Sequence, residues 1–494
     1  MMAQEGERNM FVTRIGLALV AVAAILVSLW QLEAGRAGVT RSALAAGTTP
    51  ATLYEMPGAD GPLVVVAHGF AGSRQMMEGY ALTLAKSGYR VVGFDFEGHG
   101  RNPVPMSGDV TVIEGTTARL VAETQAVVRA ARALTGETRT ALVGHSMASD
   151  IVIRTALADP LVEAVVAVSA YSEAITGQAP ARLLLISGQG EPHLRQAALA
   201  SLRQVDPSAT EGETAQGPGV IRRAVVAPWV EHVGVLHSPT ALREARDWLD
   251  AAFGRATAEP VTAPGPWLLL LLAGILLLAR PVLGLLPAVA KPAPIPRARG
   301  AMAAFLPAMV APLVLWPVGS PLLPVQGVAH LALHLALLGL MQVALLRGAG
   351  LGMSSRAVLT GLAPALWGIA VFGFALDRYG ASFMPHEGRI LPILLLALGA
   401  VPVMLGDALL RGAGMALHLA GRLALILSLG VAVALNPGQL FALFMAAPVV
   451  LLFFLVFGPL GRWTGRAGGP LAAGLGQGLI LGWALGVALP LFAA

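Results

Sequence analysis

Residues 141–149 contain a serine whose neighbours suit nucleophilic catalysis. They read Ala-Leu-Val-Gly-His-Ser-Met-Ala-Ser, a short apolar run that stops at a glycine, and Ser146 has a small residue two positions before it, Gly144, and two positions after it, Ala148. The pattern predicts a strand, a tight turn and a helix, and such a turn exposes a serine Oγ at the end of a sheet strand. Ala148 replaces the last glycine of the G-x-S-x-G pattern, where one extra methyl group is compatible with close packing of helix and strand. We therefore expect Ser146 to be a nucleophile.

Two backbone amides are candidates for binding the negative oxygen that forms when such a serine attacks a carbonyl group. Upstream, the apolar strand pattern at 63–67 runs into the turn His68-Gly69-Phe70. The amide of Phe70 and the amide of Met147, directly after Ser146, could both donate to that oxygen, at about 3–4 kcal/mol per donor. We expect these two amides to form an oxyanion hole.

Three motifs, in this order, resemble the α/β-hydrolase fold. They are His68-Gly69-Phe70, Asp95-Phe96-Glu97-Gly98-His99-Gly100-Arg101 and Gly144-His145-Ser146-Met147. The likeness is to the serine-aminopeptidase and monoacylglycerol-lipase-like branch of that superfamily, and it covers about residues 50–255. Asn102 departs from the family, which has Ser or Thr at that place. The resemblance implies a Ser-His-acid hydrolase that needs neither a cofactor nor a metal.

The resemblance also implies where the acid lies, because the family order is Ser, then acid, then His. Residues 187–192, Ser-Gly-Gln-Gly-Glu-Pro, are similar to the family's Gly-x-x-Asp-Pro turn, with Glu191 in the place of the acid. An acid before a proline at a helix start is also favoured by the helix dipole alone. Glu173, after the preceding predicted strand, is the alternative acid.

Two histidines compete for the role of base. Ser238-Pro239 is typical of the N-cap and first residue of a helix. In the family that the chain resembles, the catalytic histidine precedes this cap by about six residues, and His232 has that spacing. His237 directly precedes the cap and is the alternative base.

The stretch from about residue 36 to 259 alternates between β-rich and helical patterns, which predicts a mainly parallel sheet covered on both faces. The predicted strands are 63–67, 90–94, 140–143, 162–169, 182–187 and 220–227. The predicted helices are 75–87, 116–134, 147–158, 192–204 and 239–253. Only 45 positions separate Ser146 from Glu191, which leaves no room for a helical cap domain.

The composition indicates that a large part of the chain lies in lipid. Of its 494 residues, 56% are hydrophobic and 12% are charged, against about 45–50% and 25% in soluble proteins. We expect an N-terminal anchor at 1–31, favoured over a cleaved signal peptide, an α/β-hydrolase domain at 32–262 and an all-α transmembrane domain at 263–494. The last part contains eight apolar runs of about membrane length: 266–288, 301–318, 325–346, 357–376, 390–407, 414–435, 438–459 and 470–491.

The charges in the loops predict an orientation. From Pro264 onward the chain has 12 Arg and Lys residues and three acidic residues. Most of the basic residues lie in alternate loops between the apolar runs. The first such loop holds Lys291, whereas the second, around Gly319-Ser320, has no charge. Because basic loops favour the cytoplasm, we expect a cytoplasmic N-terminus and a hydrolase domain outside the cytoplasm, which in a bacterium is the periplasm. A nucleic acid partner is not expected, because no basic stripe interleaved with aromatic residues is present.

These observations predict a multi-pass membrane protein that hydrolyses a small ester or, less readily, an amide, of a lipid-like or envelope-associated substrate. Two alternatives stay open: an acyltransferase that uses the same serine, and a transporter or scaffold with a non-catalytic hydrolase-like domain. With no cysteine in the chain, disulfides and thiolate metal sites are excluded. His330 and His334, four residues apart in an apolar run, indicate hydrogen bonding between helices rather than a metal site with Glu387.

Overall fold

The computed structural model describes residues 2–110, 112–286, 293–318, 327–348, 350–351 and 354–493. Lys291 and Gly319-Ser320, on which part of the loop-charge argument depends, lie outside the described residues. The chain forms two compact units. We call Ser28–Leu269 together with Asp377–Ser382 the sheet unit, and Met1–Val27, Leu270–Leu376 and Phe383–Ala494 the helical unit.

The sheet unit is built on one nine-stranded sheet in the order β1-β2-β4-β3-β5-β6-β7-β9-β8. The strands are β1 Thr40–Ala46, β2 Thr49–Glu55, β3 Leu63–Ala67, β4 Arg90–Phe94, β5 Thr140–His145, β6 Val162–Val168, β7 Arg182–Gly188, β8 Thr214–Gly217 and β9 Val220–Ala227. The strands from β4 to β9 in this order are parallel neighbours, whereas β1, β2 and β8 join at the two edges by antiparallel pairing. This confirms the predicted fold class, although the sequence patterns missed β1, β2 and β8.

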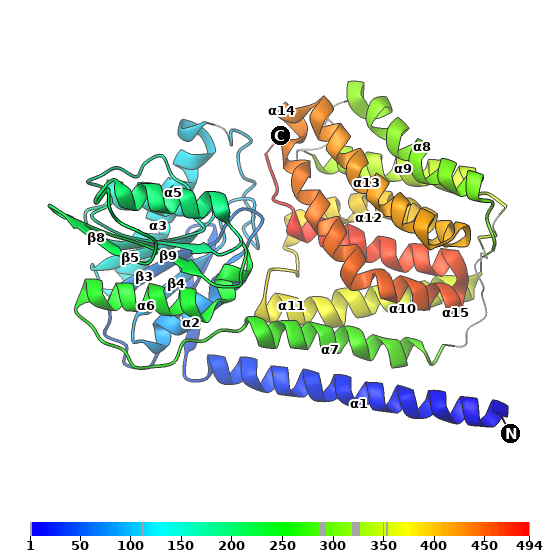
Figure 1. Cartoon of the computed structure of the whole chain (residues 1–494), viewed down its shortest axis with the longest axis horizontal. Coiled ribbons are helices and arrows are strands. Elements are labelled where there is room, and N and C mark those ends of the chain that lie inside the picture. The colour runs from blue at the N-terminus through cyan, green and yellow to red at the C-terminus, as the bar shows by residue number, and fades with distance from the viewer. Residues whose placement is uncertain are drawn as a thin grey trace. The chain divides into compact units, whose positions relative to one another are not determined.

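Helices cover both faces of the sheet, as Figure 1 shows. They are α2 Glu78–Lys86, α3 Ala118–Thr135, α4 Met147–Ala158, α5 Pro192–Arg203 and α6 Pro239–Phe253. α2 contacts α6 on one face, and α3 contacts α4 on the other. The central strand β3 is apolar throughout because both of its faces are buried. Every residue of β3 is buried, and Val64 and Val66 pack in one core with Leu242 and Leu249 of α6.

The register of the central strands brings their carboxyl ends to one edge. β3 and β5 are parallel neighbours, and Ala67 at the end of β3 pairs with Gly144 near the end of β5. The turn that follows β3 therefore lies next to Ser146, which follows β5. Among the described residues, the link 169–181 between β6 and β7 contains turns and one isolated bridge but no helix, so no cap domain is inserted there.

The helical unit contains most of the apolar helices. Its elements, of which α1, α7 and α11 are shared between the units, are α1 Met2–Arg36, α7 Gly265–Leu283, α8 Arg297–Leu315, α9 Val328–Leu345, α10 Ser355–Leu366, α11 Gly373–Tyr379, α12 Ile390–Leu410, α13 Met415–Leu435, α14 Pro437–Leu440 and α15 Ala446–Ala488. Within the described residues, eight helices are long and apolar enough to cross a membrane, which indicates a multi-pass membrane protein. The last two predicted apolar runs fall largely in α15, which is broken at Gly469.

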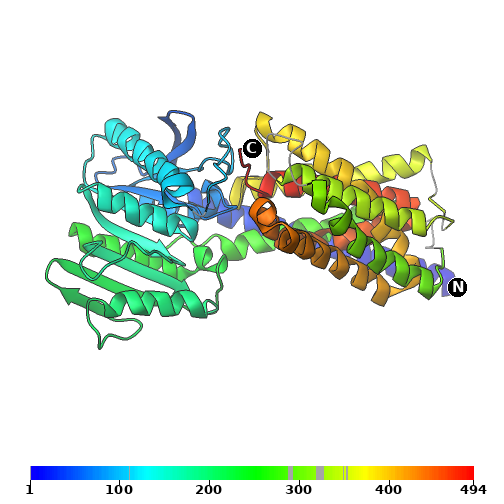
Figure 2. The ribbon, with the colours of Figure 1, turned by 90° about the horizontal axis from the view of Figure 1, so that it is seen from above.

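A row of glycines explains the close packing of α12 and α15. Gly474, Gly478, Gly482 and Gly486 recur every four residues on α15, and a Cβ at any of them would lie 2.4 to 2.7 Å from an atom of α12. Small residues at this spacing let two helix backbones approach within a bilayer, where burial from water supplies no driving force. The helices of this unit run alongside one another (Figure 2).

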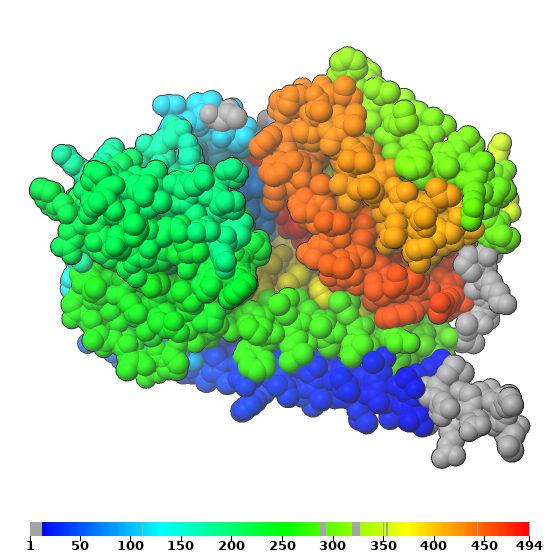
Figure 3. All heavy atoms as spheres, viewed as in Figure 1, coloured from blue at the N-terminus to red at the C-terminus, as the bar shows by residue number. Residues whose placement is uncertain are grey.

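The first part of α1 packs against α7 in the same way. A Cβ on Gly274 of α7 would lie 3.0 Å from Ile25 Cγ1 and 3.2 Å from the Ala21 carbonyl oxygen of α1. Figure 3 shows α1, in blue, directly alongside α7, in green. The N-terminal helix is thus a packed element of the helical unit.

Two polar contacts join helices inside the helical unit, where a buried charge needs a partner. Asp407 accepts from Arg422 Nε at 2.7 Å and Arg422 Nη2 at 2.9 Å. His334 Nε2 lies 2.9 Å from Ser428 Oγ on α13, which is the helix-to-helix contact expected of that histidine.

The glycine row predicts opposite effects for the same substitution at two sites. Gly482→Ala should lower the free energy of unfolding by about 1–3 kcal/mol, because the new Cβ would overlap the α12 backbone. Gly430→Ala on α13, where a Cβ meets no atom within 4 Å, should be neutral or stabilise by up to about 1 kcal/mol. Thermal unfolding midpoints in detergent measure both, and equal effects at the two positions would contradict the packing described.

Candidate active site

Ser146 lies in a strained turn between β5 and α4. Its backbone has φ 55° and ψ −120°, in a region that L-residues rarely adopt. A Cβ on Gly144 would lie 2.4 Å from the Ala148 carbonyl oxygen, so the first turn of α4 folds directly onto the end of β5. Strain of about 1–3 kcal/mol persists only where the surrounding structure imposes it. Here it presents the Ser146 hydroxyl at the carboxyl edge of the sheet.

Ser146, His232 and Glu191 form one chain of hydrogen bonds. His232 Nε2 lies 2.8 Å from Ser146 Oγ, and His232 Nδ1 lies 2.6 Å from Glu191 Oε1. A carboxylate accepts only, so Nδ1 carries the proton and Nε2 is free to accept one from Ser146. The three residues come from the segments that follow β5, β7 and β9, and parallel pairing brings those strand ends to one edge.

Glu191 is buried, and its carboxylate is held on both oxygens. Its Oε2 accepts from the Gly188 amide at 2.6 Å and from Ser169 Oγ at 2.8 Å. Burial by itself would raise the pKa of Glu191, but the hydrogen bonds from His232, the Gly188 amide and Ser169 outweigh it and hold this pKa below its usual value. The side chain therefore stays ionised beside His232 at neutral pH. Ser169 was not predicted, and only its place at the end of a strand could have indicated it.

A second histidine supports the loop that carries His232. His145 Nε2 lies 2.8 Å from the His232 carbonyl oxygen, to which it donates. Burial, together with the nearby His232, lowers the pKa of His145 to about 4. His145 is thus neutral at pH 7 and adds no positive charge next to the base. The same loop is hydrogen-bonded to the turn that carries Glu191, because the Gly190 amide donates to the Val230 carbonyl oxygen at 2.9 Å.

The turn after β3 lies directly on Ser146. A Cβ on Gly69 would lie 2.9 Å from both Ser146 Cβ and His145 Nδ1. Phe70 follows Gly69, and the turn closes when the Gly72 amide donates to the Gly69 carbonyl oxygen at 3.0 Å. Met147 is the first residue of α4, and amides in a first helical turn have no acceptor within the helix. The structure therefore brings the segments with the two predicted oxyanion donors to the nucleophile.

The two alternative residues lie elsewhere. His237 is partly buried at the end of the short helix Gly234–His237, where desolvation lowers its pKa, and its Nδ1 has no hydrogen-bond partner in the part of the chain that the structure describes. Glu173 is exposed and lies 3.4 Å from the Tyr171 hydroxyl, which donates to it. Within the described ranges, no group of three or more His, Cys, Asp or Glu side chains could hold a metal ion.

The site is open to solvent on the side of His232. The His232 side chain is 44% exposed. Trp229, three residues earlier in the same loop, is 90% exposed and has φ 61°, and its amide donates to Gln189 Oε1 at 2.9 Å. Val233, on the other side of His232, is also exposed. Large apolar side chains therefore flank His232 on its exposed side.

Residues 62–191 match a protein-family model described as the alpha/beta hydrolase fold. The sheet unit has the α/β-hydrolase fold. This match, with the sheet order and the strained turn at Ser146, supports a hydrolase. No curated protein matches the chain.

Solved structures similar to this chain cover less than half of it. A predicted CIB-like hydrolase from Thermoplasma acidophilum is 16% identical with a TM-score of 0.34, and the match covers 43% of this chain and 98% of that one. TT1662 from Thermus thermophilus is 19% identical with a TM-score of 0.33, and the match covers 44% of this chain and 99% of that one. A putative dienelactone hydrolase from Klebsiella pneumoniae is 17% identical with a TM-score of 0.33, and the match covers 44% of this chain and 99% of that one. These likenesses are too remote to transfer a substrate or an activity.

The close approach of the turn to the nucleophile predicts the effect of one methyl group. Gly69→Ala should slow the reaction of Ser146 with a fluorophosphonate by about 10- to 100-fold, because the turn must move away from the serine. Gly93→Ala in β4, where a Cβ meets its neighbours at 3.4 to 3.7 Å, is the matched control. Labelling rates at equal thermal stability measure the effect, and an unchanged rate for Gly69→Ala would contradict the geometry.

Proposed function

We propose that the protein is a membrane-bound serine hydrolase that cleaves an ester, or less readily an amide. The observation that carries this proposal is the continuous hydrogen-bond chain from Ser146 Oγ through His232 to Glu191, with distances of 2.8 and 2.6 Å. A chain of this kind has the nucleophile, the base and the orienting acid that acyl transfer through a serine needs. A binding domain needs none of these to be aligned.

In the proposed reaction, His232 Nε2 takes the proton of Ser146 as Oγ attacks the substrate carbonyl carbon. Glu191 accepts the Nδ1–H of the imidazolium and stabilises its charge. The tetrahedral intermediate collapses, the C–O bond to the leaving alcohol breaks, and His232 returns the proton to that alcohol. Water then attacks the acyl-enzyme with His232 again as base, which releases the acid and restores Ser146.

The amides of Phe70 and Met147 are the proposed donors to the oxygen that becomes negative in this reaction. Each donor is worth about 3–4 kcal/mol in the transition state. The position of Gly69 against Ser146 and the place of Met147 at the start of α4 support this assignment.

A lipid-like or envelope-associated substrate is proposed for two reasons. The described chain contains eight helices apolar enough to cross a membrane, so the enzyme works next to lipid. Exposed Trp229 and Val233 flank His232, and they offer an apolar surface to an acyl or alkyl chain at the open site.

The sheet unit is proposed to lie outside the cytoplasm. Most of the basic residues after Pro264 lie in alternate loops, which favours the cytoplasmic side for those loops. Asp377–Ser382, which form the end of α11 and the start of the intervening loop before α12, belong to the sheet unit. This membership supports a common side for that loop and the sheet unit, opposite to the basic loops.

Substitutions of the three residues test the reaction. Ser146→Ala should abolish fluorophosphonate labelling and reduce the hydrolysis of short p-nitrophenyl esters by at least about 10³-fold, because no nucleophile is left. Glu191→Gln and His232→Asn should each reduce kcat by about 10³-fold or more. The first removes the carboxylate that fixes the His232 tautomer, and the second removes the base itself. Rates are measured on the purified full chain in detergent.

The chain offers a matched control for each substitution. Glu173→Gln and His237→Asn make the same changes at the two alternative residues and should leave kcat within about threefold. Ser201→Ala removes a serine hydroxyl that donates to the Ala197 carbonyl oxygen on α5. If Ser146→Ala keeps its labelling and hydrolysis, or if His237→Asn loses activity and His232→Asn keeps it, the mechanism is wrong.

The absence of cysteine gives a direct test of sidedness. Ala200→Cys on exposed α5 and Arg347→Cys in a basic loop each create a single thiol in an otherwise cysteine-free chain. In intact bacterial spheroplasts, a membrane-impermeant maleimide should label the first variant and label the second only after permeabilisation. The reverse pattern would place the sheet unit in the cytoplasm.

A further inference from the structure

Six residues at the end of α11 and in the loop that follows it are part of the sheet unit. Asp377–Ser382 follow the first turn of α11 in sequence and precede α12, more than 100 residues after the last strand, yet they cluster with Ser28–Leu269. Their polar contacts reach segments that follow β3 and β4, the strands nearest to the turn with Phe70. We call Asp377–Ser382 the clasp.

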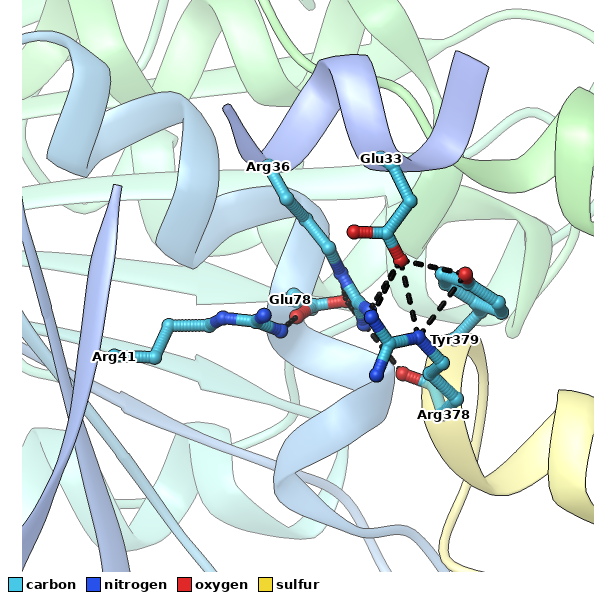
Figure 4. A network of polar contacts seen from close by, with 6 residues as sticks. All are labelled: Glu33, Arg36, Arg41, Glu78, Arg378 and Tyr379. Carbon is cyan, nitrogen blue, oxygen red and sulfur yellow. Dashed lines mark hydrogen bonds and ion pairs between the residues drawn. The ribbon is translucent and has the colours of Figure 1, made fainter. Parts of the chain in front are cut away.

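The centre of the clasp is bound to a buried ion pair. Arg36, at the end of α1, donates to Glu78 Oε2 from Nε at 3.2 Å and from Nη2 at 2.6 Å, and both side chains are almost fully buried. Arg36 Nη2 also donates to the Arg378 carbonyl oxygen. The guanidinium lies 4.4 Å from the centre of the Tyr379 ring, at cation–π distance. Figure 4 shows Arg36 between Glu78 and the clasp.

A second acid holds the same part of the clasp from α1. Glu33 Oε1 accepts from Arg378 Nη2 at 2.7 Å and from the Tyr379 hydroxyl at 2.6 Å (Figure 4). Tyr379 is itself buried. The clasp is thus held by a buried part, Arg36 and Tyr379, and by charge-assisted hydrogen bonds between Glu33 and Arg378, whose side chains are 44% and 42% exposed.

The two ends of the clasp contact the segments around the candidate active site. Asp377 Oδ2 accepts from Arg101 Nη2 at 2.6 Å, and Arg101 ends the turn after β4. The Ser382 amide donates to Ser73 Oγ at 2.9 Å. Ser73 is 2% exposed and stands at the N-cap of a short helix, but its hydroxyl makes no capping bond. Its hydroxyl is used to receive the clasp instead.

Ser73 and Arg101 are tied to the turn that carries Phe70. The fully buried Asp95 carboxylate accepts from the Arg74 amide at 2.8 Å and from the Arg101 amide at 3.1 Å, which joins the two segments. His68 Nε2 accepts from the Phe96 amide at 3.2 Å, so the start of the turn is joined to the same segment. The turn between these points lies on Ser146 through Gly69.

We propose that the clasp Asp377–Ser382 holds the turn 68–73 in its reactive position, so that Ser73 and Arg101 are positioning residues for the hydrolase reaction. This inference rests on the proposed function. The clasp contacts both segments that Asp95 joins, one at Ser73 and the other at Arg101. While both contacts hold, the turn 68–73 is restrained from moving away from Ser146. The proposed hydrolase reaction in the sheet unit thereby depends on residues at the end of α11 and in the loop that follows it.

The test removes each end of the clasp from the full-length protein. Ser73→Ala removes the acceptor for the Ser382 amide, and Asp377→Ala removes the partner of Arg101. Each should lower kcat about tenfold with KM unchanged, because an interaction that matters only in the transition state is weakened. The fluorophosphonate labelling rate should fall by a similar factor, while the final labelled fraction should stay that of the wild type.

Three further variants separate positioning from folding. Asp377→Glu keeps the charge and should restore most of kcat. Arg101→Ala should cost as much as Asp377→Ala, and the double variant no more than either one, because both remove the same contact. Hydrogen exchange of the amides in 68–73 should speed up in Ser73→Ala and Asp377→Ala, a readout that needs no substrate.

Matched controls use the same substitutions away from the clasp. Ser87→Ala removes another buried hydroxyl, which donates to the Thr83 carbonyl oxygen at 2.9 Å. Asp159→Ala breaks another half-buried ion pair, with Arg132 at 2.7 Å. Both should keep kcat within about twofold of the wild type.

The outcomes are distinct. The inference is overturned if the clasp variants keep kcat and exchange rates, or if the labelled fraction falls while kcat per labelled site stays unchanged, since that pattern reports loss of folded protein alone. If the wild type neither labels nor hydrolyses esters, the proposed function fails instead, and faster exchange in 68–73 still tests whether the clasp holds the turn.

Discussion

The strained turn at Ser146 is the constraint around which the sheet unit is arranged. Its φ of 55° is held because α4 folds back onto β5, and this contact is so close that no side chain fits at Gly144. The Ser146 amide is also engaged, since it donates to the Val168 carbonyl oxygen of the neighbouring strand β6 at 2.9 Å. With the backbone fixed on both sides, Ser146 stays at the carboxyl edge of the sheet, and the groups that contact its hydroxyl must come from other segments.

Parallel strand pairing brings the other groups of the candidate site close to Ser146. The carboxyl ends of β3, β5, β7 and β9 lie at one edge of the sheet, and the turns that follow them carry the oxyanion candidates, Ser146, Glu191 and His232. Electrostatics then sets their states: hydrogen bonds hold the pKa of Glu191 below its usual value, and burial keeps His145 neutral. A charged acid and an uncharged neighbour together favour the proton transfer to His232 that the proposed mechanism requires.

Much of this arrangement was predictable because it follows from local patterns. Apolar runs marked the central strands, and the residues selected around Ser146, Glu191 and His232 proved to lie within hydrogen-bond distance of one another. The hairpin of β1 and β2 was missed because its Ala- and Thr-rich strands lack a clear apolar alternation. The break of α15 at Gly469 and the contacts of Asp377–Ser382 were also missed. These contacts join residues about 300 positions apart, and hydrophobic periodicity carries no information on such pairings.

The central claim is that the hydroxyl at this turn is the group that attacks the substrate. Mass spectrometry of the full-length protein after reaction with a fluorophosphonate, followed by proteolysis, tests it most directly. The account predicts one adduct per chain, on the peptide that contains Ser146, with its formation blocked by prior incubation with an ester substrate. An adduct on another residue, or none on a protein shown to be folded, would contradict it.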